Sequence, residues 1–535
     1  MKRAGTMALA AMAVLISILS PATAALAHGE LLNSEPAASS SLAESPTQIS
    51  LFFSESIEPV FARIRILNST GSEIASGNAR RDSGDHSVVR SISPHLEPGA
   101  YVVVWRVTSA DGHPIEGAFE FFIGTQQESA SDLEATLLHS YHEDPSVNYV
   151  RTLLRWIVYV GVIGLIGSMM MRGMLKRPAD LDSRSVMVTF GTWLIAVFGS
   201  LMTLVAYGPN ATGTNFYNLS LLGQTLRTTY GQATVARLVL LAAIAILIYF
   251  RRHISRLVWS ASALVLCIGI VATLSLTGHP VVQHPALLSV GIDTVHMSAV
   301  SSWIGGIALL SLGGSRWYHE NDGYVVRRFS AIATWMVIVI IATGVSQAWL
   351  MMDGFSNLFS SDFGRTLLIK TTAVAVLVSL GLLSRRTLKL NGPASVRRVI
   401  GTELFVGLVV VAISALLIGT PPRQLQAAEP FTATLVRSSV IANVTITPTR
   451  VGLAELHVIV TPPGGALVQV ISASARMALQ DRDIPNIPIE LIRIGPNHFS
   501  GTVNIAYPGT WDLEVLIVPS PNMTLLFQTS FGATD

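Results

Sequence analysis

Residues 101–124 decide the fold of the amino-terminal region, with the sequence YVVVWRVTSADGHPIEGAFEFFIG. Two segments rich in β-branched and aromatic residues flank a polar turn, SADGHP, that contains glycine and proline. Shorter segments of the same kind, QISLFFSE, ARIRILN and SVVRSIS, precede it and are separated by turn residues. This spacing predicts an all-β sandwich over residues 28–124, followed by a polar linker over 125–147.

The first 27 residues have the parts of a secretory signal peptide. A basic start and an apolar stretch precede Ala25-Leu26-Ala27, which fits the small-x-small rule for cleavage. Cleavage there would make His28 the first residue of the mature chain and give it a free α-amino group. An uncleaved membrane anchor is the alternative.

The middle of the chain is apolar enough to cross a membrane several times. A bilayer span needs about 20 mostly apolar residues, and eight stretches are near that length. They predict a membrane domain over residues 148–420 with eight helices. The stretches are 150–171, 186–206, 234–250, 257–277, 289–312, 329–352, 366–383 and 400–419.

The distribution of basic residues predicts the orientation of these spans. The loops after spans one, three, five and seven together carry fifteen lysines and arginines. The loops after spans two, four and six carry only Arg227 and Arg365. The positive-inside rule places the first set of loops in the cytoplasm. Both ends of the membrane domain are therefore expected outside the cell membrane, which agrees with an exported amino terminus.

The carboxyl-terminal region returns to strand patterning after a Pro-containing linker, 421–430. Segments such as VIANVTITP and TWDLEVLIV predict a second small β-sandwich over 431–535. Within the membrane region, TYGQATVAR and DFGRTLLIK form a weak repeat, in which Arg237 and Lys370 take equivalent places. We expect both of these basic side chains to extend to the outer surface.

The amino-acid composition excludes several classes of protein and of binding partner. Half of the residues are hydrophobic and 13% are charged, which is too apolar for an ordinary soluble protein. Acidic residues outnumber basic ones over 28–147, so this region favours cations and argues against nucleic acid. Cys267 is the only cysteine, which excludes a disulfide framework and a Cys-based zinc site.

The amino-terminal region holds a candidate copper site. A terminal His28 would offer its α-amine and its imidazole Nδ1 to one metal ion, and copper(II) favours such nitrogen coordination. Asp111 and His113 lie two residues apart in the polar turn and could complete the ligand set, with Glu55 as a further oxygen donor. Taken alone, His113 fits an ordinary turn histidine better than a metal ligand.

A second candidate cluster lies at the outer end of the membrane domain. His279 and His284 fall in the loop after the fourth span, and Asp293 and His296 share one face of the fifth helix. Imidazole and thioether groups can accept copper, and thioether favours copper(I). The histidines could instead be polar loop residues or a structural pair with Asp293. The thioethers at the same end belong to Met297, Met351 and Met352.

The segments HGELLNSEPA, LFFSESIEP and YVVVWRVTSADGHPIEGAFEFFIG resemble the CopC copper-binding domain over its whole length. The resemblance implies a copper(II) site formed by His28, Asp111 and His113, together with Glu55. Some CopC domains add a methionine-rich copper(I) loop. The amino-terminal domain of this chain has no methionine, so we expect no such site there.

The membrane region resembles CopD, chiefly through SLTGHPVVQHPALLSVGIDTVHMSAVSSWIGGIALL, and 431–535 resembles the YtkA-like β domain through GPNHFSGTVNIAYPGTWDLEVLIV. These resemblances imply a multi-pass plasma-membrane protein that binds and transports copper, with import as the expected direction. The expected partners are copper ions and the lipid bilayer. No ATP-binding loop is present, and no catalysis is expected. The alternatives are a copper sensor or chaperone without transport, and an oxidative enzyme whose copper is held by an amino-terminal histidine.

Overall fold

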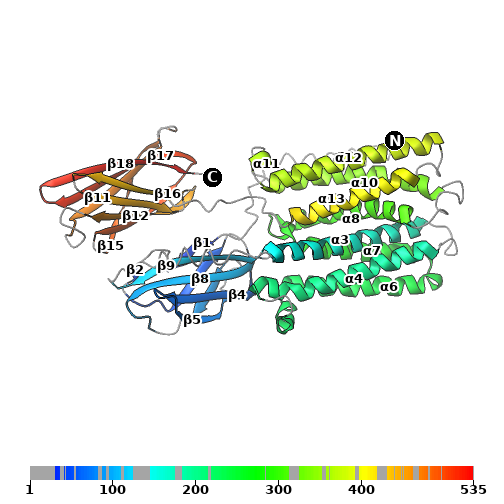
Figure 1. Cartoon of the computed structure of the whole chain (residues 1–535), viewed down its shortest axis with the longest axis horizontal. Helices are drawn as coiled ribbons and strands as arrows, with labels where there is room; N and C mark the ends of the chain where they lie inside the picture. The colour runs from blue at the N-terminus through cyan, green and yellow to red at the C-terminus, as the bar shows by residue number, and fades with distance from the viewer. Residues whose placement is uncertain are drawn as a thin grey trace.

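The computed structural model has the predicted fold class: two β domains and, between them in sequence, a bundle of long helices (Figure 1). Both β domains lie at the same end of the bundle. The predicted signal peptide and the linker 421–430 lie outside the described residues. The structure describes residues 31–533, except 37–40, 43, 54–55, 82–86, 92–94, 110–111, 113, 125–144, 175–182, 215–217, 284, 313–323, 352–356, 361, 392–396, 419–430, 439, 448, 450, 462–468, 480–481, 483 and 496.

Two sheets, in which all strand pairs except β2 with β9 are antiparallel, form the amino-terminal domain. Their strand orders are β1-β3-β7-β6 and β2-β9-β8-β4-β5. The strands are β1 (Leu31–Glu35), β2 (Ser41–Leu42), β3 (Gln48–Phe53), β4 (Ile57–Asn68), β5 (Glu73–Asn78), β6 (Arg80–Arg81), β7 (Ser87–Ser91), β8 (Gly99–Ser109) and β9 (Pro114–Ile123).

The alternation of apolar and polar side chains along the strands produces the core of this domain. Leu51 and Phe53 of β3 and Val103 and Trp105 of β8 are buried in one cluster, because every second side chain of a strand points to the same face. The rings of Phe53 and Trp105 meet edge to face, with centroids 5.2 Å apart. The pairing of β8 with β9, which brings Arg106 opposite Glu116, leaves the turn between these strands at one tip of the domain.

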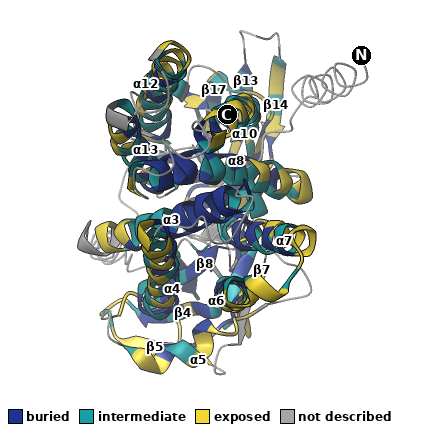
Figure 2. Cartoon of the chain, turned by 90° about the vertical axis from the view of Figure 1, so that its right-hand side faces the viewer, coloured by how far each residue is buried: buried dark blue, intermediate teal, exposed yellow. Residues whose placement is uncertain are grey.

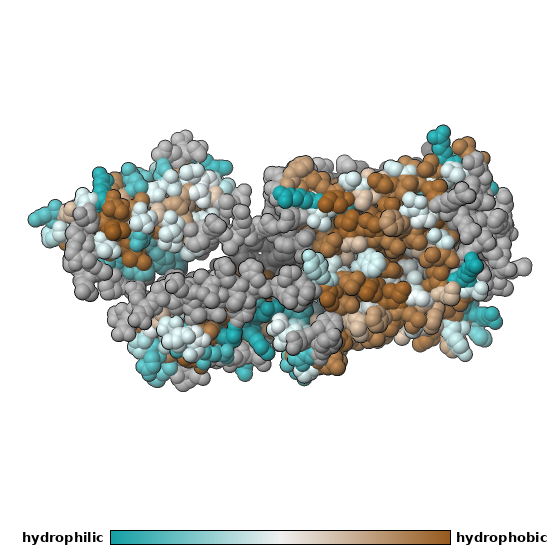
Figure 3. All heavy atoms as spheres, in the orientation of Figure 1, coloured by the Kyte–Doolittle hydropathy of each residue, from teal (hydrophilic) through white to brown (hydrophobic). Residues whose placement is uncertain are grey.

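Within the described residues, eight helices are long and apolar enough to span a membrane, which confirms the number predicted from sequence. Figure 3 shows hydrophobic side chains as a broad belt across the face of the bundle that is in view. The long helices are α3 (Pro145–Met174), α4 (Ser183–Thr212), α6 (Thr229–Tyr249), α7 (Arg256–Ser275), α8 (Ala286–Leu312), α10 (Tyr324–Met351), α12 (Asp362–Asn391) and α13 (Arg397–Leu417). The short ones are η2 (Leu219–Leu221), α5 (Leu222–Thr225), η3 (Phe250–His253), η4 (His279–Val281) and α11 (Asn357–Ser360).

Helices α3 and α8 form the buried centre of the bundle (Figure 2). They cross closely at Gly167 and Gly305: a Cβ atom on Gly167 would lie 2.0 Å from the carbonyl carbon of Gly305. Small residues permit this backbone contact in membranes, where helices associate by packing rather than by exclusion of water. This crossing fixes the position of α8 against α3, and α8 carries Asp293 and His296.

The carboxyl-terminal domain is also a pair of sheets packed face to face. Their orders are β10-β11-β12-β16-β15 and β14-β13-β17-β18, and Trp511 is fully buried between them. The strands are β10 (Phe431–Arg437), β11 (Val440–Thr447), β12 (Gly452–Thr461), β13 (Ser472–Leu479), β14 (Ile484–Ile489), β15 (Ile492–Gly495), β16 (His498–Ile505), β17 (Gly509–Ser520) and β18 (Met523–Ala533).

Two histidines that are 41 residues apart meet on one sheet of this domain. His457 Nδ1 lies 3.1 Å from His498 Nε2, and His457 Nε2 lies 3.3 Å from a carboxylate oxygen of Glu455. Because a carboxylate only accepts, His457 donates from Nε2 to Glu455 and accepts from His498 at Nδ1. The burial of His498, with His457 beside it, lowers the pKa of His498 to about 4.

Acidification is therefore expected to loosen the carboxyl-terminal domain. The folded-state pKa of His498 lies below its unfolded value of about 6.5, so the unfolded chain binds the proton more readily and stability falls as the pH drops from about 6.5 towards 4. Hydrogen exchange of β12 and β16 in the full chain should show a loss of about 2 kcal/mol between pH 7 and pH 5. His498→Gln should remove most of this pH dependence; an unchanged dependence in the variant would assign it to another group.

Candidate functional site

The amino-terminal domain docks on the bundle through Arg106 of β8. Its guanidinium donates to the backbone carbonyls of Ala211 and Asn210 at the end of α4, at 3.0 and 3.1 Å. The same group forms an ion pair with Glu116 at 2.9 Å. One planar guanidinium can satisfy all three acceptors because its donors are fixed in a fork. Arg106 thus joins the sheet to the end of the bundle.

A second polar contact anchors the domain at the start of α6. A carboxylate oxygen of Glu58 in β4 accepts from the backbone N–H of Thr229 at 3.1 Å, and the Thr228 hydroxyl caps the same helix by accepting from Gly231 N. Negative charge is stabilising at a helix amino terminus. Contact between Glu58 and α6 therefore favours the docked arrangement.

The turn that carries two of the predicted copper ligands lies against this interface. Gly112 packs on a stacked pair of tyrosines, Tyr207 and Tyr230, whose ring centroids are 4.3 Å apart. A Cβ atom on Gly112 would lie 3.3 Å from Tyr207 and 3.7 Å from Tyr230. Gly112 has a φ of +87°, a conformation that glycine adopts readily. The flanking Asp111 and His113, like His28 and Glu55, lie outside the described residues, so their role as ligands stays a prediction.

The same end of the bundle contains a cavity of about 170 Å³ between α3, α8, α10, α12 and α13, which we call the outer cavity. Four of the predicted residues, His279, Asp293, His296 and Met297, line it. The other polar or charged lining residues are Tyr159, Gln283, Ser289, Gln347, Lys370 and Ser414.

Hydrogen bonding orients the imidazole of His296. Its Nδ1 lies 2.8 Å from the hydroxyl oxygen of Thr343 on α10, and that hydroxyl donates its only proton to the carbonyl of Val339 at 2.6 Å. Nδ1 of His296 must therefore be the donor, which leaves Nε2 with the lone pair that a metal ion requires. Gly344 allows the ring to approach α10, since a Cβ atom there would lie 3.5 Å from the imidazole.

Two more of these predicted residues are also held by polar contacts. Gln347 of α10 donates to Asp293 at 2.8 Å, so one carboxylate oxygen is fixed by an amide. His279 is almost fully buried, and its Nε2 lies 3.1 Å from the carbonyl of Ile418. A carbonyl only accepts, so Nε2 of His279 carries a proton.

These potential copper-binding side chains line the same cavity, but those that the structure describes are not arranged around a single metal position. Among the residues that the structure describes, no group of three or more His, Cys, Asp or Glu side chains is arranged to hold a metal ion. His284 and Met352 lie outside the described residues, and the side chain of Met351 is not described either. The described side chains of the outer cavity that could bind copper thus come from η4 (His279) and from α8 (Asp293, His296 and Met297).

The sequence predicts that Arg237 and Lys370 both extend to the outer surface, and the structure places both differently. Arg237 does not extend to the outer surface: it is 2% exposed and donates to the hydroxyl and the carbonyl of Thr273 at 2.9 and 3.2 Å. Internal acceptors on α7 make a buried position possible. Lys370 lines the outer cavity, where its ammonium group would oppose a bound cation and the carboxyl group of Asp293 would offset it.

Three family models match the chain. The CopC domain matches residues 31–124, the N-terminal domain of copper resistance protein D-like proteins matches 146–286, and copper resistance protein D matches 323–417. The matched segments coincide with the amino-terminal sandwich and with most of the helical bundle.

Individual relatives agree with these matches. Copper transport protein CutJ of Bacillus subtilis is 25% identical over 83% of this chain and 84% of its own length. Copper resistance protein C of Pseudomonas syringae pv. tomato is 36% identical over 18% of this chain and 81% of its own. The crystal structure of CopC from Methylosinus trichosporium OB3b is 33% identical and covers 19% of this chain and 99% of that one, with a TM-score of 0.18. The chain therefore belongs to the copper transport and resistance proteins in which a CopC domain and a CopD membrane domain are fused.

Proposed function

We propose that this protein binds copper(II) outside the cell membrane and carries copper through its helical bundle into the cytoplasm. In this proposal, His28, Asp111 and His113, with Glu55, hold copper(II) in the amino-terminal domain. The outer cavity then receives the ion at His279, Asp293 and His296. Binding and passage, rather than catalysis, are the whole of the proposed activity.

One observation supports this proposal most strongly. The turn around Gly112 packs on Tyr207 and Tyr230 at the end of the bundle, and the outer cavity lies at this same end. A copper ion released from the turn would thus start its passage beside the membrane domain. Because the amino-terminal domain is covalently linked to the bundle, it raises the local concentration of copper there without any increase in the affinity of the outer cavity for copper.

The chemistry of the outer cavity suits an ion in transit. Imidazole nitrogens, a carboxylate and the thioether of Met297 can each bind copper, and the thioether favours copper(I). A complete cage would hold the ion too tightly, whereas conduction requires binding that is favourable but weak or divided among several sites. His279, Asp293 and His296 line the outer cavity without forming such a cage among the described residues, which suits the second kind of binding.

Copper uptake by proteoliposomes tests the proposal. Residues 28–535 would be reconstituted, and copper supplied from the side of the β domains would be followed inside the vesicles. We expect saturable uptake above that of vesicles without protein. Uptake equal to that of empty vesicles would leave a sensor or chaperone as the better account, and oxygen-dependent cleavage of a glycan by the copper-loaded protein would support an enzyme.

A further inference from the structure

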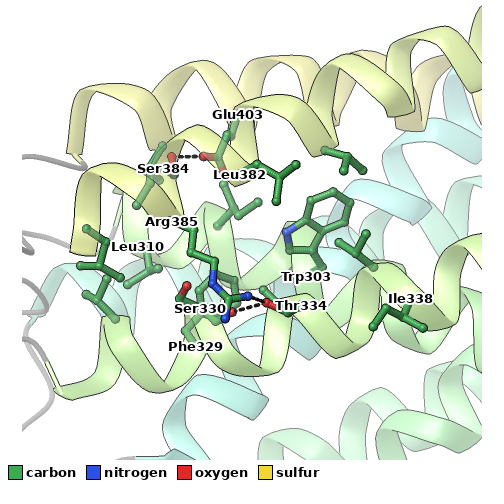
Figure 4. A pocket seen from close by; sticks show the side chains of 18 residues that line it. Trp303, Leu310, Phe329, Ser330, Thr334, Ile338, Leu382, Ser384, Arg385 and Glu403 are labelled. Atoms are coloured by element: carbon green, nitrogen blue, oxygen red, sulfur yellow. Dashed lines mark hydrogen bonds between the residues drawn. The ribbon is translucent and has the colours of Figure 1, made fainter. Parts of the chain in front are cut away.

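A second cavity lies in the opposite half of the bundle, and we call it the inner cavity. Its volume is also about 170 Å³, and it lies between α8, α10, α12 and α13. Its wall is largely apolar, with polar side chains from three helices (Figure 4). These are Ser330 and Thr334 of α10, Ser384 and Arg385 of α12, and Glu403 of α13.

Among the described residues, Trp303 alone lines both cavities. It is 5% exposed and lies seven residues after His296 on α8, which places the two side chains on the same face about 10 Å apart along the helix axis. The indole packs against Gly381 of α12, where a Cβ atom would lie 3.8 Å from its ring. Trp303 therefore separates the space near His296 from the inner cavity.

The inner cavity holds a carboxyl group close to the end of the membrane domain that we assign to the cytoplasm. Glu403 is buried and accepts a hydrogen bond from the hydroxyl of Ser384. Arg385 points the other way, across the cavity to Thr334 of α10 (Figure 4). An ionisable residue within a membrane is costly, and such residues mark functional sites such as ion paths and proton relays.

We propose that Trp303 is the barrier between the outer and inner cavities, and that Glu403 is the inner binding group for the copper ion that passes it. This inference rests on the proposed function for its cargo. The barrier itself does not depend on the cargo, so it can be tested without copper. A large apolar side chain at a constriction blocks ions because it keeps the constriction dry.

Thiol labelling tests the barrier. Cys267 is the only cysteine, so Cys267→Ser gives a background for single cysteines at Ser414→Cys in the outer cavity and Ala333→Cys in the inner cavity. A membrane-impermeant methanethiosulfonate should label Ser414→Cys from the side of the β domains and Ala333→Cys from the other side. Adding Trp303→Ala should speed labelling of Ala333→Cys from the β-domain side at least about tenfold.

Trp335→Ala is the matched control, because Trp335 is 47% exposed on α10 and lines neither cavity. It should leave both labelling patterns unchanged. Labelling of Ala333→Cys at the same rate from both sides while Trp303 is intact would disprove the separation. If Trp303→Ala leaves the labelling rate of Ala333→Cys from the β-domain side unchanged, Trp303 is not the barrier. A clear labelling pattern in a protein without copper uptake would overturn the proposed function alone.

Uptake by proteoliposomes tests Glu403. Glu403→Gln keeps the shape of the side chain but removes its charge, so we expect at least about tenfold slower uptake with unchanged thiol labelling. Ser384→Ala removes only the hydrogen-bond partner and should slow uptake less than about threefold. Wild-type uptake by Glu403→Gln would exclude this carboxyl group as the inner binding group.

Discussion

Replacing His296 with alanine should reduce copper uptake by at least about a hundredfold, because losing a group that binds the metal costs more than losing a residue that only orients such a group, which costs about 10–100-fold. His296 lies in the wall of the outer cavity, and the Thr343 hydroxyl directs its Nε2 lone pair away from α10. The measurement is the initial rate of copper uptake by proteoliposomes that contain equal amounts of correctly folded protein.

Two further variants separate ligand binding from general damage. Thr343→Val removes the acceptor that orients the imidazole and should reduce uptake by about tenfold. His253→Ala removes an exposed histidine at the opposite end of the bundle and should leave the rate unchanged. Equal rates for His296→Ala and wild type would exclude His296 from the copper path.

Adding one residue before His28 should weaken copper(II) binding by the amino-terminal domain by about a hundredfold, or about 2.7 kcal/mol. The added residue moves the α-amine away from the imidazole and so opens the predicted chelate ring. Competition with a copper(II) chelator of known affinity, on the full chain, measures the change. Processing at Ala27 should first be verified by amino-terminal sequencing.

An extra residue after Asp535 is the control, because it changes the length of the chain far from His28. Unchanged copper(II) affinity after extension at His28 would mean that the α-amine is not a ligand. Loss of affinity in both extended proteins would point to damage rather than to the chelate.

Most of the fold could be predicted because it depends on local patterns. Alternation in segments such as the one at 101–124 defines strands, and eight apolar stretches of sufficient length define the spans. The meeting of His457 with His498 could not be predicted. It depends on the register of β12 against β16, which pairs His457 with Ser500 and Ile459 with His498, and register depends on the whole sheet.

The candidate site was predicted only in part, for a similar reason. Helical periodicity alone placed Asp293 and His296 on one face, and they line the same cavity. Their partners Gln347 and Thr343 come from α10, and no sequence pattern shows which faces of two membrane helices meet. The interpretation of Arg237 failed because its acceptors belong to Thr273 on α7.

The central claim is that copper moves from the amino-terminal domain into the outer cavity, and the location of bound copper tests it most directly. Anomalous scattering at the copper edge from crystals of the copper-loaded mature protein would show each site. We predict one peak at His28 near the Tyr207–Tyr230 pair and a second, weaker peak about 2 Å from Nε2 of His296. A protein that transports copper but shows no peak in the outer cavity under any loading condition would contradict this account.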